Sequence, residues 1–207
     1  MKKIPFFTLL SSILLLSSCS NKLADNELSG HLLLGPFSTA GKSGDMINQK
    51  LESLANVSDE ELIKGYKELF AFPYPVQMAP QAQAILLKDF NATDKTSAIG
   101  AINVLMEESK SGDHKAYTYS LAVNVANLAY SSGYFTQKDV TDYEQKVLIE
   151  AKINYNNWDK YLNDFLKGRE NKLKDDPNSS QQLYEVIVHE LFLKNKNSPY
   201  LKLEFAF

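Results

Sequence analysis

Cysteine is almost absent from this sequence, which has one Cys among 207 residues. A single cysteine cannot close an intrachain disulfide, and it cannot supply the thiolates of a cysteine-based zinc site. Basic residues are also in deficit: 22 Lys and Arg face 25 Asp and Glu, which excludes a general nucleic-acid binder that needs a basic patch. The 44% hydrophobic and 23% charged content excludes disordered, collagen-like and coiled-coil chains.

Motifs for nucleotides, metals and nucleophilic catalysis are incomplete. Residues 36–43 end like a phosphate-binding loop, but Pro36 stands where that loop needs its first glycine. His189 and Glu190 begin like a zinc-protease motif, but position 193 is Leu, so the second histidine ligand is missing. The Gly-x-Ser-x-Gly pattern of a nucleophile elbow does not occur. We therefore expect no catalytic residues, metal, cofactor or nucleotide, and an enzyme is the less favoured class.

The first 18 residues are typical of an export signal. Residues 1–3 carry two lysines, and residues 4–16 are mostly apolar but shorter than the ~20 residues of a membrane span. The segment ends in Leu16-Ser17-Ser18-Cys19, which resembles a bacterial lipobox. The resemblance implies cleavage between Ser18 and Cys19, a diacylglyceryl group on the Cys19 thiol and a fatty acid such as palmitate on the new amine. The alternative is an ordinary signal peptide with a chance cysteine.

Cleavage would leave an acidic body on a lipid anchor. It removes Lys2 and Lys3, which takes the formal net charge from −3 to −5. The residue after the cysteine is Ser20. By resemblance to enterobacterial lipoproteins, an Asp at this position would favour retention at the inner membrane, so a Ser favours the outer membrane. The expected location is therefore the cell envelope, at the periplasmic face of the outer membrane, with the bilayer contacted through acylated Cys19.

Hydrophobic periodicity predicts an all-α (mainly α) fold, as a single compact helical domain of about six to eight helices. We expect a tether and loop over residues 19–45 and the helical domain over residues 46–207. Apolar spacing predicts helices near residues 44–56, 80–90, 116–132 and 183–191. Capping residues predict four more. One begins at a capping box at residues 58–61, one runs between Asp94 and Gly112, one begins after Thr136, and one begins after Asn156 or Asn157.

Residues 116–137 form an uncharged stretch of 22 positions. A membrane span is a poor interpretation because serines, threonines and asparagines fall inside the stretch. A helix that is apolar nearly all round is instead typical of the buried centre of a domain, and Gly133 is its expected left-handed end.

The C-terminal residues 201–207 alternate apolar and polar side chains, which predicts a strand. A lone strand leaves its backbone groups unpaired, so we expect it to pair with the apolar run at residues 31–35.

Two stretches of the sequence form one pattern. The first runs from Ala116-Tyr117 through Asn124 to Gly133-Tyr134-Phe135, and the second from Trp158 to Gly168-Arg169. This pattern resembles that of the bacterial domain-of-unknown-function 1266 family, and the resemblance covers about residues 60–173. The family often carries an Asp and an Arg in the first of these helices, where this chain has Thr118 and Leu121. The resemblance implies an all-helical fold and no established activity. The matching residues, to which we assign structural roles, are Asn124, Gly133, Tyr134, Trp158, Gly168 and Arg169.

Trp158 and Arg169 also have interpretations that do not depend on the family. Trp158 lies three residues before Tyr161 and seven before Phe165, a spacing typical of one buried helix face. Arg169 is the one arginine among 22 basic residues, which indicates a need for its planar guanidinium. We expect it to cap helix carbonyls or pair with a carboxylate, with a ligand contact as the alternative.

Three functions stay open from the sequence. The first is a non-enzymatic binding module in the envelope with an unknown protein partner, including an immunity-type protein that neutralises a toxin. The second is a hydrolase acting on envelope material, which would need a polar pocket with a perturbed carboxylate or histidine. The third is a structural or assembly lipoprotein of an envelope complex.

Overall fold

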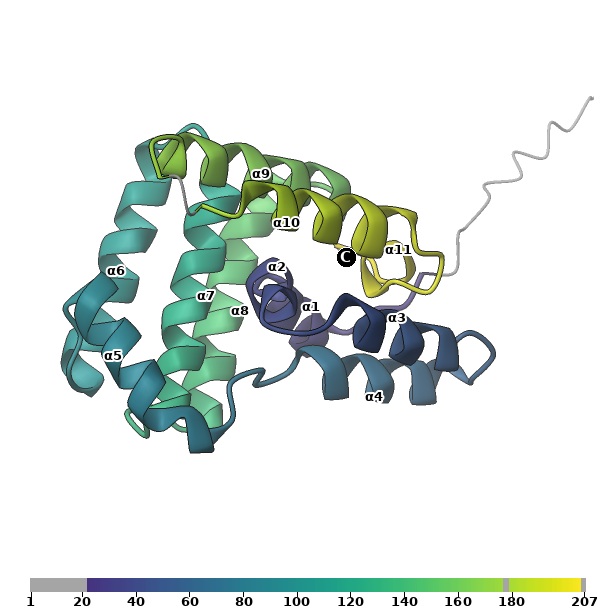
Figure 1. Ribbon diagram of the computed structural model, residues 1–207, viewed down its shortest axis with the longest axis horizontal. Helices are drawn as coiled ribbons and strands as arrows, with labels where there is room; N and C mark the ends of the chain where they lie inside the picture. The colour runs from purple at the N-terminus through teal and green to yellow at the C-terminus, as the bar shows by residue number, and fades with distance from the viewer. Residues whose placement is uncertain (1–21, 177–178, 206–207) are drawn as a thin grey trace, which may run out of the picture.

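The computed structural model describes residues 22–176 and 179–205 (Figure 1). Within these ranges the chain forms eleven α-helices, a 3₁₀ turn η1 (Val76–Met78) and a π-helical segment η2 (Ile187–Lys194), and no β-strand. The all-α class expected from the sequence is confirmed. The number of helices exceeds the expected six to eight because several helices are only four to seven residues long. Ser18 and Cys19 lie outside the described residues.

The long helices begin where the sequence places their caps. Ser58 and Glu61 form the expected capping box, Thr136 and Asp139 form another, and the Asn157 side chain accepts from the backbone N–H of Lys160. The helices of ten or more residues are α3 (Gly44–Ser53), α4 (Asp59–Phe70), α5 (Ala79–Phe90), α6 (Lys95–Ser111), α7 (Lys115–Ser131), α8 (Gln137–Asn154) and α9 (Trp158–Leu173).

Helix α7 is the buried centre of the domain, with α5, α6, α8 and α9 packed around it (Figure 1). Its polar side chains are hydrogen-bonded inside the protein: Ser120 Oγ donates to the Leu33 carbonyl at 2.8 Å and Ser131 Oγ to the Pro75 carbonyl at 2.9 Å. Gly133 adopts a φ of +80° directly after the helix, which is the left-handed end expected there. Of the helices in the described ranges, none is long and apolar enough to cross a membrane.

Residues 26–40 form two short buried helices, so the prediction of a tether and loop is wrong for them. They are α1 (Asn26–Leu32) and α2 (Gly35–Ala40). The Asp25 side chain caps α1 by accepting from Leu28 N–H at 2.9 Å, and Pro36 lies in the first turn of α2. Leu28 and residues 32–34 are fully buried. Helices this short and buried this completely show no amphipathic period in the sequence.

The expected C-terminal strand is also wrong. Residues 199–202 form the short helix α11 (Pro199–Lys202), which begins at a Ser198 cap with proline in its first turn. Leu203 makes one parallel bridge, and its partner is Leu23 rather than residues 31–35. The alternation in the sequence instead reflects burial of Leu203 and Phe205 on either side of the half-buried Glu204.

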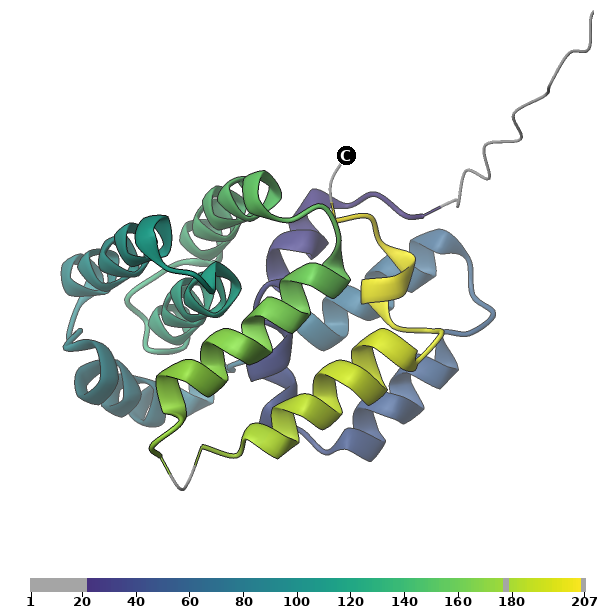
Figure 2. The same cartoon turned by 90° about the horizontal axis from the view of Figure 1, so that it is seen from above.

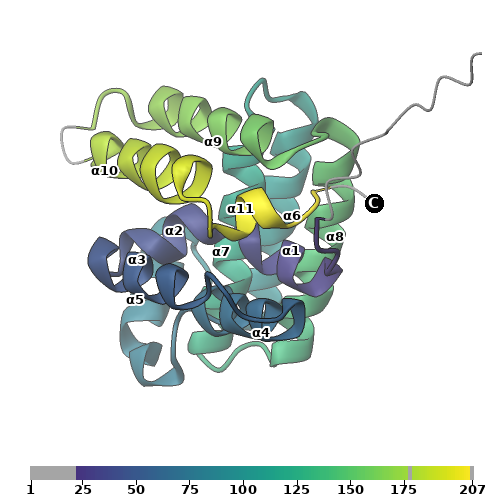
Figure 3. The same ribbon diagram turned by 90° about the vertical axis from the view of Figure 1, so that its right-hand side faces the viewer.

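The remaining helices pack on α9, on α1 and on one another. Helix α10 (Gln181–Val186) continues into η2, and this pair runs antiparallel beside α9 (Figure 2). Helices α3 and α4 lie together at one end of the domain, linked by an ion pair between Lys50 and Glu68 at 2.9 Å. In Figure 3, α1, α8 and the start of the described chain share one side of the molecule, and α10, α3 and α5 lie toward the other.

Candidate functional site

The N-terminus of α7 is capped by a carboxylate from a different helix. The first amide groups of a helix have no acceptor within it, and the helix dipole favours negative charge there. Here the Ala116 N–H donates to Asp164 Oδ2 of α9 at 3.1 Å and to the Tyr155 hydroxyl at 2.9 Å. Asp164 therefore joins α9 to the start of the central helix.

His114 completes this cluster as the residue just before α7. Its Nδ1 lies 2.8 Å from Asp164 Oδ1, and the Tyr155 hydroxyl donates to Asp164 Oδ2. Burial raises the pKa of Tyr155 well above its usual range, and the hydrogen bond to Asp164 raises it further, so this hydroxyl stays protonated and serves as a donor. His114 and Asp164 are 28% and 18% exposed, so solvent reaches the histidine. With Nδ1 bonded to the carboxylate, Nε2 is the ring nitrogen left for other contacts.

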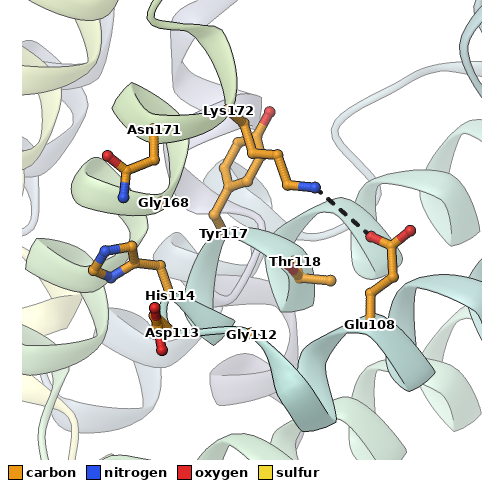
Figure 4. Close-up of a pocket in the computed structure, with 9 residues that line it drawn as sticks. All are labelled: Glu108, Gly112, Asp113, His114, Tyr117, Thr118, Gly168, Asn171 and Lys172. Carbon is orange, nitrogen blue, oxygen red and sulfur yellow. Dashed lines mark ion pairs between the residues drawn. The ribbon is translucent and has the colours of Figure 1, made fainter.

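A cavity of about 310 Å³ opens beside His114, between α6, α7 and α9. Lys172 extends from α9 toward Glu108 of α6, with Nζ 4.0 Å from Oε2 (Figure 4). Both side chains are more than half exposed, so the pair contributes little to stability. The cavity lining carries both signs of charge beside apolar surface. It is lined by Glu108, Gly112, Asp113, His114, Tyr117, Thr118, Gly168, Asn171 and Lys172.

Gly168 sets how closely α9 approaches the start of α7. A Cβ atom at this position would lie 2.7 Å from the Tyr117 Cβ, 2.9 Å from the His114 Cβ and 3.2 Å from the His114 carbonyl oxygen. These neighbours are backbone or next to it, so rotation of a side chain cannot relieve the contact. Glycine is therefore required for the close packing that places Asp164 on the helix terminus.

Gly168→Ala is expected to lower the free energy of unfolding by about 1–3 kcal/mol, because the added methyl group overpacks this contact. Gly100→Ala is the matched control: it lies in the interior of α6 with open space around its Cβ position, and it should raise stability by about 0.5–1 kcal/mol. Urea unfolding of both variants measures the difference. Equal stability of the two variants would contradict the close-packing assignment.

Arg169, the next residue along α9, joins that helix to the start of α10. One guanidinium nitrogen donates to Gln181 Oε1 at 2.8 Å and another to the Ser179 carbonyl, and the guanidinium lies 3.9 Å from the centre of the Tyr184 ring. Arg169 is 5% exposed. From the sequence we expect Arg169 to cap helix carbonyls or to pair with a carboxylate. In the described residues its partners are instead a loop carbonyl, a side-chain amide and an aromatic ring. A planar guanidinium suits that combination better than an ammonium group does.

A second polar cluster is fully buried between α1, α7 and α8. His31 Nδ1 lies 2.6 Å from Glu144 Oε2, with both side chains 1% exposed. Glu144 Oε1 accepts a hydrogen bond from Asn127 Nδ2 at 2.9 Å. The edge of the His31 ring packs on Phe72, with ring centroids 5.2 Å apart. This cluster has no route for a ligand, so we assign it to the packing of three helices.

The other residues of the family pattern lie in the middle of α7, in the turn after α7 and at the start of α9. Asn124 Oδ1 accepts from the Tyr74 hydroxyl at 2.7 Å, and Tyr134 donates its N–H to the Ala129 carbonyl at 2.8 Å in the turn after α7. Trp158 begins α9 and is 2% exposed. Of the family-pattern residues, Gly168 lines the cavity beside His114.

Sequence reasoning missed the side chains that form both polar clusters. His114 and Asp164 are 50 residues apart, and their meeting depends on how α9 crosses α7. One signal was present for the buried cluster: Glu144 lies four residues after Val140 and three before Val147, on the apolar stripe of α8. An acidic residue on such a stripe indicates a buried partner.

The site offers polar contacts, with His114 Nε2 as the ring nitrogen that is not bonded to Asp164. Among residues 22–176 and 179–205, no group of three or more His, Cys, Asp or Glu is placed to hold a metal ion. Asp164 and Tyr155 are engaged in capping α7.

The fold defines an all-helical domain built around one buried central helix, with a small cavity at the start of that helix that is lined by acidic and basic side chains. The chain belongs to the family described as "Protein of unknown function (DUF1266)", whose model matches residues 41–205. The match extends the resemblance seen over residues 60–173 in both directions. No curated protein and no solved structure matches the chain.

Proposed function

We propose that this protein is a lipid-anchored, non-enzymatic binding module of the bacterial envelope. One observation carries the proposal: the single cysteine of the chain follows Leu16-Ser17-Ser18, where a lipobox requires it. A thiol is the soft nucleophile that thioether formation needs. Two or more acyl chains make attachment to a bilayer stable, whereas one chain is reversible.

The binding role is supported by apolar side chains that the domain leaves exposed on its surface. Val76 and Met78 of η1 are 52% and 40% exposed, and Leu183 and Val186 of α10 are 45% and 51% exposed. A contiguous apolar patch on a surface marks a protein-interaction site, and these side chains are the candidates for one here. An immunity-type protein that binds an incoming toxin is one version of this function.

The hydrolase and assembly alternatives have weaker support. A hydrolase would use His114 Nε2 as its base, but Asp164 and Tyr155 are already engaged in holding the start of α7. The cavity lining includes one hydroxyl-bearing aliphatic residue, Thr118, which is 8% exposed. An assembly lipoprotein would share the anchor and differ in forming a stable complex with a membrane partner.

Cys19→Ala is expected to abolish membrane attachment, because the acylated thiol is the proposed link to the bilayer. The measurement is fractionation of cells that express the tagged full chain, followed by detection of the tag in membrane and soluble fractions. Ser20→Ala is the matched control: it changes the next residue, keeps the thiol and should stay in the membrane fraction. A Cys19→Ala chain that remains fully membrane-bound would contradict the proposal.

A further inference from the structure

The chain is fixed to the body of the protein only four residues after Cys19. The Leu23 N–H donates to the Lys202 carbonyl at 2.9 Å, and the Glu204 N–H donates to the Leu23 carbonyl at 3.0 Å. Asp25 then caps α1. Leu23 is therefore held on the C-terminal segment, and the chain between Cys19 and this fixed point is much shorter than the tether and loop expected over residues 19–45.

A four-residue link restricts which face of the protein can meet a membrane. Fully extended, four residues reach at most about 14 Å. A folded chain of this length has a radius of gyration of roughly 16 Å, so the body is more than twice as wide as the link is long. The face that carries Leu23 must therefore lie next to the bilayer in which Cys19 is anchored.

That face carries two exposed isoleucines on α8. Gln145 Nε2 donates to the Asn26 carbonyl at 2.8 Å, and Lys152 Nζ donates to Asn26 Oδ1 at 2.8 Å, so this side of α8 lies against the start of α1 (Figure 3). Ile149 lies one helical turn from each of these two residues, and Ile153 lies one turn further along. They are 61% and 74% exposed, whereas most large apolar side chains of the domain are buried.

Basic side chains accompany this apolar pair. Lys22 and Lys202, both exposed, are next to the two residues of the Leu23–Leu203 bridge. Long lysine side chains pack their methylene groups on apolar surface and place their charge among anionic headgroups. Glu204 lies on the other side of Leu203, so the charge beside the link is mixed and the apolar pair is the main support for lipid contact.

We infer that Ile149 and Ile153 form a membrane-contact surface that enters the headgroup boundary of the bilayer when Cys19 is acylated. The inference rests on the proposed lipid anchor. The occupant is lipid because the link ends beside these residues and is too short to present another face. Contact with lipid removes both isoleucines from water and gives the protein a fixed orientation, with α10, α3 and α5 directed away from the membrane.

The test is the environment of a probe at position 153 in the acylated protein. Thioether formation consumes the Cys19 thiol, so Ile153→Cys introduces the one free thiol of the mature chain. The full chain is expressed, purified as the mature protein, labelled with an environment-sensitive fluorophore and placed in phosphatidylethanolamine–phosphatidylglycerol vesicles at low protein-to-lipid ratio. Val186→Cys, 51% exposed on α10, is the matched control.

The expected result is a blue-shifted emission at position 153 that spin-labelled lipid quenches, with neither effect at position 186. A water-like probe at position 153 on a chain whose mass shows acylated Cys19 would overturn the inference and leave the anchor intact. A blue shift that lipid does not quench would also overturn it, because a second copy or another segment would then cover the isoleucines. A mature chain without acyl groups would overturn both proposals.

Discussion

Glu144→Ala is expected to lower the free energy of unfolding by about 3–5 kcal/mol, measured by urea unfolding followed by circular dichroism. Removal of the Glu144 side chain leaves the buried Nδ1 of His31 without the oxygen that lies 2.6 Å from it, and an unpaired polar group is costly in a low-dielectric interior. His31 and Glu144 are both 1% exposed, and Asn127 also loses its acceptor on Glu144. Because these three residues belong to α1, α8 and α7, the loss weakens the contacts among three helices at once.

Two controls separate this effect from the loss of any carboxylate. Glu144→Gln keeps an oxygen that accepts from Asn127 and should lose less stability than Glu144→Ala. Asp142→Ala removes an exposed ion pair, in which the Asp142 side chain is 52% exposed and the Lys138 side chain 82%. The free energy of unfolding should therefore change by no more than about 1 kcal/mol. Should Glu144→Ala unfold at the same urea concentration as Asp142→Ala, the buried cluster would have no structural role.

Trp158→Ala is expected to destabilise the domain by about 3–5 kcal/mol, the usual cost of replacing a large buried aromatic residue with alanine. Trp158 is 2% exposed at the first turn of α9. Its ring packs edge to face on Phe205, Tyr200 and Tyr161, with centroid distances of 4.6, 5.1 and 5.9 Å. The substitution leaves a cavity where α9 meets the C-terminal segment.

The loss of protection from hydrogen exchange should be largest in the C-terminal segment. Hydrogen exchange at the Glu204 amide, which bonds to the Leu23 carbonyl, should speed up more than exchange at amides in the middle of α7. Trp158→Phe retains part of the aromatic contact and should lose less stability. A uniform loss of protection across the chain would contradict the local role of Trp158.

The parts of the fold that the sequence predicts are those set by local chemistry. Capping residues such as Ser58, Thr136 and Asn157 bond to amides three residues away, so their effect can be read from spacing alone. The uncharged composition of residues 116–137 similarly predicts the buried position of α7. Helices α1 and α2 could not be predicted this way, because their burial comes from contacts with α4, α8 and η2.

In the candidate site, too, the sequence predicts local features and not the contacts between distant helices. Gly168 could be singled out from the sequence as a family-pattern residue with a structural role, either close packing or a helix cap. The partners it brings together could not, because Asp164 reaches the start of α7 only when α9 crosses that helix. His31 and Glu144 meet for a comparable reason: α1 packs on α8 although most of the chain separates them.

The lipid anchor is tested by the mass of the mature protein extracted from membranes. We expect a chain that begins at Cys19, carries the added mass of a diacylglyceryl group and an N-linked fatty acid, and has no thiol that reacts with iodoacetamide. A chain with its cysteine free and alkylated by that reagent, or one that still begins at Met1, would contradict the lipid anchor.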